Sequence, residues 1–359
     1  MIDAAAKYVL KLQPKWLETG KASPNKPAVV LSQRFGLSRN LKKYPFLKIA
    51  TALEKDAIFS EVAEAVKKTN LFGIEKFIKI NLKECNFLFE NLLFEKDILP
   101  YSVLDNDWTQ GVLADGAEKF PTILINTKNH LDIFADAAFG EEAEALAKLN
   151  EVDNILGEEL LFGYNPDIGF LMANPEECGS GLFMETVAHL PALVLTEEIN
   201  EVLNGISIMG ARAEGVQNSG TTAWGAFFKI TANFSDMNEK ELIAKTKEIQ
   251  NALLVAETKA RKRLFKEARI VMEDKIYRCL GIMQHARIMS ISQLFNFISL
   301  LRLGSEYKVF PVGMRTLNAL FKHGWTANII MIREITGDTD IDEERATMYR
   351  SLLSSIDEL

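Results

Sequence analysis

No proline occurs between Pro191 and Pro311, and this gap limits what the second half of the chain can become. Proline breaks helix interiors, so a long stretch without it favours long helices. From Ser235, a residue type that caps helices, apolar side chains recur at helical spacing through Leu264. Further helical patterns cover 271–303, 312–323 and 341–355. We therefore expect the chain to end in a helical domain.

The preceding part of the chain mixes strand and helix patterns. Strands are predicted in TILIN at 122–126, DIGFLMAN at 167–174 and WGAFFKITANF at 224–234, where apolar residues run together or alternate. Residues 141–156 show the pattern of an amphipathic helix, and the turn-forming residues of 174–183 predict a loop. These patterns predict an α+β domain ahead of the helical one.

Domain limits follow from the change of pattern near 257–268. We expect an N-terminal helix and linker at 1–27, an α+β domain at 28–260 and a helical domain at 261–359. The helical domain either packs on the α+β domain or makes a subunit contact, and the sequence leaves both open.

Composition and charge exclude several kinds of partner. The 359 residues carry a net charge of -8, which repels nucleic acid. The one basic cluster, KARKR at 259–263, fits a solvated helix face. Three cysteines, no CxxC pair and four histidines predict neither a disulfide framework nor a metal site. Without a signal-peptide pattern or a transmembrane run, we expect a cytoplasmic protein that does not contact a membrane.

Five segments carry a resemblance to a known family. They are VVLSQRFGLSRNLKKYPF (29–46), INTKNHLDI (125–133), IGFLMANPEECGSGLFMETVAHLPALVLT (168–196), ARAEG with FFKITAN (211–233) and EDKIYRCLGIMQHARIMS (273–290). In this order they resemble the guanidino kinases, and most closely the bacterial protein-arginine kinases. The resemblance implies an antiparallel sheet flanked by helices, followed by a helical dimerisation domain. It also implies transfer of the γ-phosphoryl group of MgATP to a guanidinium nitrogen.

Transfer of this kind needs arginines around the triphosphate and carboxylates around the guanidinium group. At the phosphate end, the resemblance places Arg34 and Arg212 where the family has arginines. At three further arginine positions the chain has Gly36, Asp132 and Phe183. Losing one such donor typically costs about 3–4 kcal/mol of transition-state stabilisation, so the changes disfavour turnover of ATP.

At the guanidinium end, the chain lacks carboxylates that the family has. Thr127 and Lys128 stand at the two glutamate positions of the family, and Asn129 stands at the following aspartate. Asn174 replaces the cysteine that flanks the substrate guanidinium. His130 is kept, and although its residue type suits a base or a ligand, we expect it to hold the loop in place.

Two further motifs, the glycine-rich loop and the last motif, also differ from the family. Glu176 and Glu177 stand where the family has neutral residues in the glycine-rich loop, and Cys178 occupies a different place in the motif from the family's cysteine. In the last motif the family's carboxylate is missing from its place. Gln217 lies nearest to that place, and Glu214 is a candidate substitute.

The C-terminal helix pattern holds one more motif. The protein-arginine kinases have an RDxxRA motif that binds phosphoarginine, and this chain keeps Asp342 and Arg345 but has Ile341 at the leading arginine. At a spacing of i,i+3 on a helix, Asp342 and Arg345 share a face. They form either an intrahelical ion pair or a weakened docking site for phosphoarginine or a partner.

The changes favour a pseudokinase that acts as an adaptor or regulator without a cofactor. The resemblance implies a homodimer through the helical domain, and as partners an activator of the McsA type and an AAA+ unfoldase of the ClpC type. The alternative is an active protein-arginine kinase that uses MgATP, in which Arg34, Arg212, Lys128 and Glu214 form a different clamp. A third hypothesis is a regulatory protein whose cleft binds another small anion.

Overall fold

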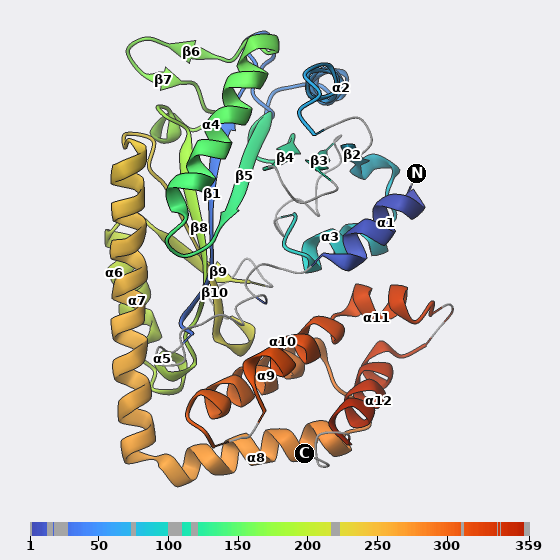
Figure 1. The fold of residues 1–359 in the computed structure, drawn as a ribbon, viewed down its shortest axis with the longest axis vertical. Coiled ribbons are helices and arrows are strands. Elements are labelled where there is room, and N and C mark those ends of the chain that lie inside the picture. The colour runs from blue at the N-terminus through green and yellow to red at the C-terminus, as the bar shows by residue number, and fades with distance from the viewer. Residues whose placement is uncertain are drawn as a thin grey trace.

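The computed structural model describes residues 2–12, 17, 28–72, 77–99, 110–115, 121–216, 223–309, 312–335, 337 and 339–354. Figure 1 shows a large sheet with helices on both sides and a group of C-terminal helices beyond one end of it. The N-terminal helix of the predicted segment 1–27 is present as α1, whereas most of its linker lies outside the described residues.

The large sheet has eight strands in the described part of the chain, in the order β2-β3-β4-β5-β1-β8-β10-β9, and neighbours run antiparallel. The strands are Phe77–Asn81 (β2), Gly111–Asp115 (β3), Thr122–Ile125 (β4), Leu131–Ala137 (β5), Val30–Arg39 (β1), Leu182–His189 (β8), Phe227–Asn233 (β10) and Arg212–Gly215 (β9). A separate hairpin joins β6 (Tyr164–Asn165) to β7 (Gly169–Phe170). The antiparallel sheet confirms the predicted α+β fold.

The helices are α1 (Ile2–Lys11), α2 (Ala52–Lys68), α3 (Phe87–Glu95), α4 (Glu142–Glu159), α5 (Pro191–Leu195), α6 (Ile199–Ile208), α7 (Glu239–Glu267), α8 (Arg269–His285), α9 (Ile291–Glu306), α10 (Met314–His323), α11 (Thr326–Ile332) and α12 (Ile341–Ser354). Several helix starts are fixed by local sequence. Thr51 and Glu54 form a capping box at α2, and Ser290 and Gln293 form another at α9.

One face of the sheet packs against α2, α4 and α7. Side chains along a strand alternate between the two faces, and on this face Phe35, Leu37, Ile133, Met184 and Ile230 are fully buried or nearly so. They belong to the largest core cluster, together with apolar residues from the three helices. Burying one such side chain typically contributes about 1.5–3 kcal/mol, so this core is the main support of the sheet.

The opposite face is covered by two groups of helices. α1 and α3 pack near β3, β4 and β5, where Leu124 and Phe134 share a core with Phe89. The C-terminal helices pack at the other end of the face, where Val187 and Phe227 belong to their core. Between these two apolar regions lies a polar strip, formed by Arg34, Asp136, Glu185 and Lys229.

The chain ends in a group of helices, as predicted. α7 and α8 meet at a bend at Ala268, after which α8 runs across the bottom of the view in Figure 1. Leu294, Phe295, Phe321 and Tyr349 are fully buried among α8–α12. α7 continues through residue 260 without a break, so the boundary expected at 260 stays a prediction. Among the described helices, none is long and apolar enough to cross a membrane.

Two element predictions are wrong in their limits. Within 167–174, only Gly169 and Phe170 form a strand, because the chain turns at Gly169 (φ 97°) and enters a 3-10 turn capped by Asn174. The long helix does not begin at Ser235. Its N-cap is Asn238, whose side chain accepts hydrogen bonds from two backbone N–H groups of the first turn.

The basic cluster KARKR is not wholly a solvated face. Arg261 in its centre is fully buried and forms ion pairs with Glu257 and Glu306. It also donates a hydrogen bond to the carbonyl of His189 at 3.2 Å. Arg261 therefore joins α7 to β8 and α9, and only its neighbours Lys259 and Lys262 are exposed in this cluster.

Candidate functional site

The strand register brings the predicted phosphate-end positions onto one face of the sheet. Arg34 in β1 lies opposite Glu185 in β8, Glu185 lies opposite Thr231 in β10, and Thr231 lies opposite Arg212 in β9. Side chains two residues apart on a strand point the same way. Gly36, Phe183 and Asp132 therefore belong to the same face, which is the face that carries the polar strip.

Phe183 fills the space above Gly36. The two residues lie opposite one another in the register of β1 and β8. A Cβ atom at position 36 would lie 2.0 Å from Cζ of the Phe183 ring and within 2.5 Å of both Cε atoms. Two of the three lost arginine positions are thus occupied by one aromatic ring packed against bare backbone.

Asp132, at the third lost arginine position, is satisfied by local donors. Its carboxylate accepts hydrogen bonds from the Ser38 hydroxyl at 2.6 Å, the Thr127 hydroxyl at 2.6 Å and the Asn129 amide at 3.1 Å. Thr127 and Asn129 stand where the family has carboxylates, whereas Asp132 stands where it has an arginine. The negative charge gained at Asp132 is therefore accompanied by the loss of negative charge at its two neighbours. This network leaves a buried carboxylate where a phosphate contact would be needed.

Lys128 forms an ion pair with the glycine-rich loop, so a cation at a glutamate position of the family meets a carboxylate at a neutral position. The Lys128 Nζ lies 2.6 Å from the Glu177 carboxylate, and the Asn174 amide donates to the same carboxylate at 3.4 Å. Lys128 is more than half exposed, whereas Glu177 is mostly buried. Thus the residue at the second glutamate position joins its loop to the glycine-rich loop through the ion pair with Glu177.

His130 is a structural residue in this loop. It is fully buried, its Nδ1 accepts the Leu41 N–H at 2.9 Å, and its Nε2 lies 3.0 Å from the Pro45 carbonyl. Burial lowers the pKa of His130, although the Pro45 carbonyl and Asp132 act in the opposite direction. Both ring nitrogens are engaged, so the side chain has no free nitrogen for a substrate.

Arg34 is held by carboxylates on three sides. Its Nε lies 2.8 Å from Asp136, its Nη1 lies 3.5 Å from Glu185, and its Nη2 lies 3.6 Å from Asp97. The guanidinium also lies over the ring of Phe134, 4.3 Å from its centre. Burial acts to lower the pKa of Arg34, but Asp136, Asp97 and Glu185 more than offset it and raise the pKa.

Lys229 is a second cation of this cluster, and the sequence analysis missed it. Its Nζ lies 2.8 Å from Asp97 and 3.1 Å from Glu185. Burial acts to lower the pKa of Lys229, but the attraction of these two carboxylates outweighs it and the pKa is raised. With Arg34 and Asp136, the cluster has two cations and three carboxylates, so its net charge opposes the binding of a triphosphate.

Arg212 and Glu214 lie at the edge of the same face, in β9. Both side chains are exposed, and Arg212 makes no ion pair with any residue that the structure describes. Partial burial raises the pKa of Glu214, Lys229 acts to lower it, and Glu185 adds to the rise. Gln217, the residue nearest to the missing carboxylate position, lies outside the described residues.

At the C-terminal motif, Arg345 is buried and fully engaged. It donates to the carbonyls of Gly324 and Met289 at 2.7 Å and to the Thr326 hydroxyl at 2.9 Å, and it forms an i,i+3 ion pair with Asp342. These bonds join α12 to the starts of α9 and α11. Asp342 is partly exposed, and the proposal that it docks phosphoarginine stays a prediction.

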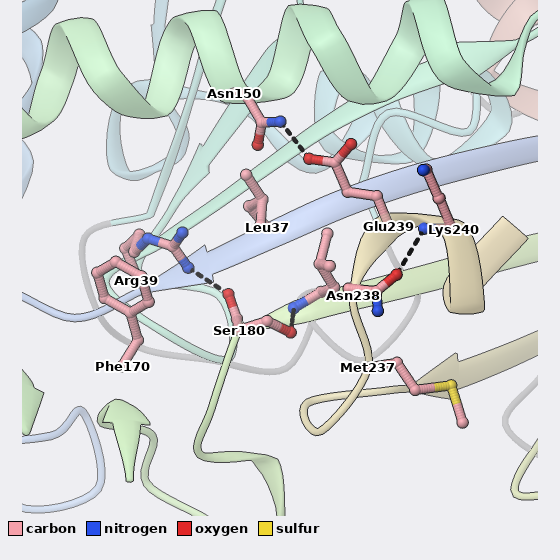
Figure 2. A pocket seen from close by; sticks show the side chains of 10 residues that line it. Leu37, Arg39, Asn150, Phe170, Ser180, Met237, Asn238, Glu239 and Lys240 are labelled. Atoms are coloured by element: carbon pink, nitrogen blue, oxygen red, sulfur yellow. Dashed lines mark hydrogen bonds between the residues drawn. The ribbon is translucent and has the colours of Figure 1, made fainter. Parts of the chain in front are cut away.

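A hollow of about 640 Å³ lies on the opposite face of the sheet (Figure 2). It is lined by Arg39, Phe170 and the start of α7, where Glu239 accepts a hydrogen bond from Asn150 of α4. Arg39 donates to the Ser180 carbonyl and lies over the Phe170 ring. The hollow is separate from the polar strip and contains none of the positions that the sequence analysis selected.

The residues of the polar strip do not fit a bound MgATP. A triphosphate would meet Asp97, Asp136 and Glu185 around Arg34, and the ring of Phe183 above Gly36. Within the described ranges, no group of three or more histidine, cysteine, aspartate or glutamate side chains is arranged to hold a metal ion.

The antiparallel sheet carries the positions that match the family's arginines on one face, as expected for a guanidino phosphotransferase. Comparison of the sequence with family models leads to the same class. Residues 53–260 match the family model of the ATP:guanido phosphotransferase C-terminal catalytic domain, and residues 269–359 match that of the protein-arginine kinase McsB C-terminal domain. The chain belongs to the ATP:guanido phosphotransferase family. β1, which carries Arg34 and Gly36, precedes the first matched region.

Similar curated proteins are protein-arginine kinases. That of Clostridium novyi is 29% identical over 352 residues, which cover 95% of this chain and 99% of the relative. That of Moorella thermoacetica is also 29% identical over 352 residues, covering 96% and 99%. That of Caldanaerobacter subterraneus is 28% identical over 302 residues, covering 84% and 89%.

Solved structures with a similar fold are phosphagen kinases. The duplicated taurocyamine kinase of Schistosoma mansoni with transition state analog components has a TM-score of 0.54 and 16% identity, and the match covers 79% of this chain and 39% of that one. Lombricine kinase has a TM-score of 0.51 and 18% identity, covering 68% and 72%. These similarities confirm the fold.

Proposed function

We propose that this member of the family is a catalytically impaired protein-arginine kinase, a pseudokinase that acts through binding to other proteins. The observation that carries the proposal is the Phe183 ring above Gly36. It blocks the space in which two arginines would clamp a phosphate. The carboxylates around Arg34 support the same conclusion, because they neutralise one of the two arginines that remain at the phosphate end.

Changes at the guanidinium end support the proposal independently. Thr127 and Asn129 donate hydrogen bonds to Asp132, and Lys128 forms an ion pair with Glu177. None of these three side chains supplies a carboxylate that could take a proton from a guanidinium group. A site without its base and without most of its clamp lacks both elements of phosphoryl transfer.

Partner proteins are proposed from the resemblance to protein-arginine kinases. They are an activator of the McsA type and a ClpC-type AAA+ unfoldase, and the expected assembly is a homodimer through the helical domain. The exposed apolar side chains of α8 support a subunit contact, since Ile270 is 81%, Tyr277 53% and Ile282 46% exposed. Light scattering of the purified protein and copurification with the two partner types would test the assembly.

One observation favours the alternative of a rewired kinase. Arg212 is an exposed cation without an ion partner in the described part of the chain, and Glu214 lies two residues away on the same face. In that alternative, Arg212 would contact phosphate and Glu214 would act as the base. Arg34 and Lys128 would complete this clamp, and Lys128 would have to give up its ion pair with Glu177 to do so.

Calorimetric titration with MgATP separates the two functions. A pseudokinase of this kind gives no binding heat at millimolar nucleotide, while an active protein-arginine kinase measured in parallel does. Saturable binding that is abolished by Arg212→Ala would favour the rewired kinase. The matched control is Arg278→Ala, because Arg278 is an exposed arginine on α8, outside the polar strip and its arginine positions.

A further inference from the structure

Three consecutive residues at the end of α3 reach three different parts of the molecule. Glu95 is the last residue of the helix, Lys96 is its C-cap, and Asp97 follows in a left-handed conformation with φ 58°. A non-glycine residue in this conformation is uncommon and is kept where surrounding contacts require it. The side-chain contacts of Glu95, Lys96 and Asp97 supply this requirement.

Glu95 connects α3 to the helical domain. Its carboxylate accepts hydrogen bonds from the backbone N–H groups of Ala327 at 2.6 Å and Asn328 at 2.9 Å. These are the positions that an N-cap side chain would normally serve, and Trp325, the N-cap of α11, provides no such bond. The start of α11 is thus capped by a residue of the first domain.

Lys96 supports the same contact. It is buried, and its Nζ donates to the Asn328 side chain at 3.0 Å and to the Leu10 carbonyl of α1 at 3.3 Å. α1, α3 and α11 therefore meet at this point. The position of residues 95–97 depends on where α11 lies.

Asp97 points the other way, to the polar strip of the sheet. Its carboxylate lies 2.8 Å from the Nζ of Lys229 and 3.6 Å from Nη2 of Arg34, and its carbonyl accepts from Nη1 of Arg34 at 3.1 Å. The chain thus places its own carboxylate between the two cations of the strip. Without Asp97, these cations would keep Asp136 and Glu185, with Glu214 near Lys229 at the edge of the sheet. The place that the Asp97 carboxylate fills between them would then be open to another carboxylate of the same charge.

We propose that residues 95–97 form a latch. In this latch Asp97 is an internal ligand of Arg34 and Lys229, and the hydrogen bonds of Glu95 to the start of α11 keep it in place. Moving the helical domain away from α3 would withdraw Asp97 and open the pair of cations to a small carboxylate or similar monovalent oxyanion. The latch does not depend on the proposed loss of kinase activity, because nothing in it involves nucleotide.

Formate, the smallest carboxylate, is the probe for the internal ligand. The Asp97→Gly variant removes the carboxylate, and glycine adopts positive φ without strain. We expect sodium formate to raise the melting temperature of this variant by several degrees more than sodium chloride at equal ionic strength, with no such difference for wild type. The matched control is Glu197→Gly, since Glu197 is exposed and also has a positive φ of 61°.

Two further variants make the formate result specific. Adding Lys229→Met to Asp97→Gly should abolish the response to formate, because one of the two cations is gone. If Asp97→Gly does not fold, Asp97→Ala replaces it, since alanine also leaves the place of the carboxylate empty, although its positive φ is less favourable than that of glycine. A folded Asp97 variant that responds equally to formate and chloride would overturn the assignment of Asp97 as internal ligand.

Glu95→Gln tests the connection to the helical domain. It weakens the cap of α11 and leaves Asp97, Arg34 and Lys229 intact. We expect a response to formate that lies between those of wild type and Asp97→Gly, because the segment is released more often. A folded Glu95→Gln protein that is as insensitive to formate as wild type would show that Glu95 does not hold the latch.

Discussion

Gly36 and Phe183 lie opposite one another in neighbouring strands, and a Cβ atom on residue 36 would lie 2.0 Å from Cζ of the Phe183 ring. Carbon atoms that are not bonded are favourably spaced at about 3.5–4.0 Å, so the ring needs glycine beneath it. Position 36 has no room for a larger side chain while Phe183 stays as it is. Glycine at position 36 and phenylalanine at position 183 therefore fit one another as a pair.

The first prediction is that Gly36→Ala destabilises the protein. The added methyl group pushes the Phe183 ring out of its place, and overpacking of this kind typically costs about 1–3 kcal/mol. In a Phe183→Ala background the same change should cost clearly less, because the ring is absent. Urea unfolding of the four proteins measures the coupling.

The control for this prediction is Gly281→Ala in the helix α8. A Cβ atom there would meet no atom within 4 Å. Alanine is favoured over glycine inside a helix by up to about 1 kcal/mol, so this variant should be neutral or more stable. Equal losses for Gly36→Ala in both backgrounds would mean that Phe183 is not the obstacle.

The second prediction concerns Arg345, the buried arginine of the C-terminal motif. Arg345→Ala leaves the carbonyls of Gly324 and Met289 without donors and should lower the free energy of unfolding by about 3–5 kcal/mol. The matched control Arg278→Ala removes an exposed i,i+4 partner of Asp274 and should change little. Chemical denaturation gives both values, and similar values for both variants would contradict a structural role for Arg345.

The third prediction is a pH dependence caused by Lys96. Burial first, and then the nearby Lys322, lower the pKa of Lys96 from 10.5 to about 8, while Glu95 acts in the opposite direction. Between pH 8 and 10.5 the unfolded chain therefore binds more protons at this residue than the folded protein does. Stability contributed by Lys96 must rise with pH across this window, by about 3 kcal/mol in total.

Comparison with Lys96→Met isolates this contribution from other groups that titrate at alkaline pH. Methionine has a similar length and no charge. The difference in unfolding free energy between wild type and variant should move in favour of wild type as pH rises from 8 to 10. A constant difference over this range would show that the pKa of Lys96 is not lowered in the folded protein.

The fourth prediction is that the Lys128–Glu177 ion pair contributes little to stability. Lys128 is 58% exposed, and pairs of this kind typically contribute about 0–1 kcal/mol. A double-mutant cycle with Lys128→Ala and Glu177→Ala measures the coupling directly. A coupling energy above about 2 kcal/mol would mean that the two loops depend on this pair for their fold.

The sequence predicted the fold well because long patterns and co-linear motifs carry much information. The antiparallel sheet, the helical ending and the limits of α4, α10 and α12 agree with the structure to within a few residues. The error at 167–174 has a local cause, since the chain turns between Asn165 and Gly169 and only Gly169 and Phe170 pair on the return. Similarly, Asn238 and not Ser235 is the N-cap of α7, because the Asn238 side chain accepts hydrogen bonds from two backbone N–H groups of the first turn.

The candidate site was only partly predictable. The motifs pointed to Arg34, Gly36, Phe183, Asp132 and Arg212, and the strand register places all of them on one face. Alternation along the strand would also have pointed to a residue missed before, because Glu185 lies two positions after Phe183.

Lys229 and Asp97 were missed for different reasons. Lys229 lies in the segment 224–234, which was predicted only as an apolar strand. A lone lysine buried in such a strand needs an ionic partner, and this could have pointed to it. Asp97 gave no signal, because its role depends on a left-handed turn and on contacts with residues far away in the chain. Contacts of this kind follow from the tertiary fold and not from any local pattern.

The central claim is that the protein does not carry out phosphoryl transfer to arginine. Its most direct test is incubation of the purified protein with MgATP, an arginine-rich substrate protein and an activator of the McsA type, followed by mass spectrometry for phosphoarginine under conditions that preserve it. We predict no phosphoarginine above the level seen without the protein, on the substrate or on the chain itself. Phosphoarginine that forms with time and is abolished by Arg212→Ala would contradict the claim and establish a working, rewired kinase.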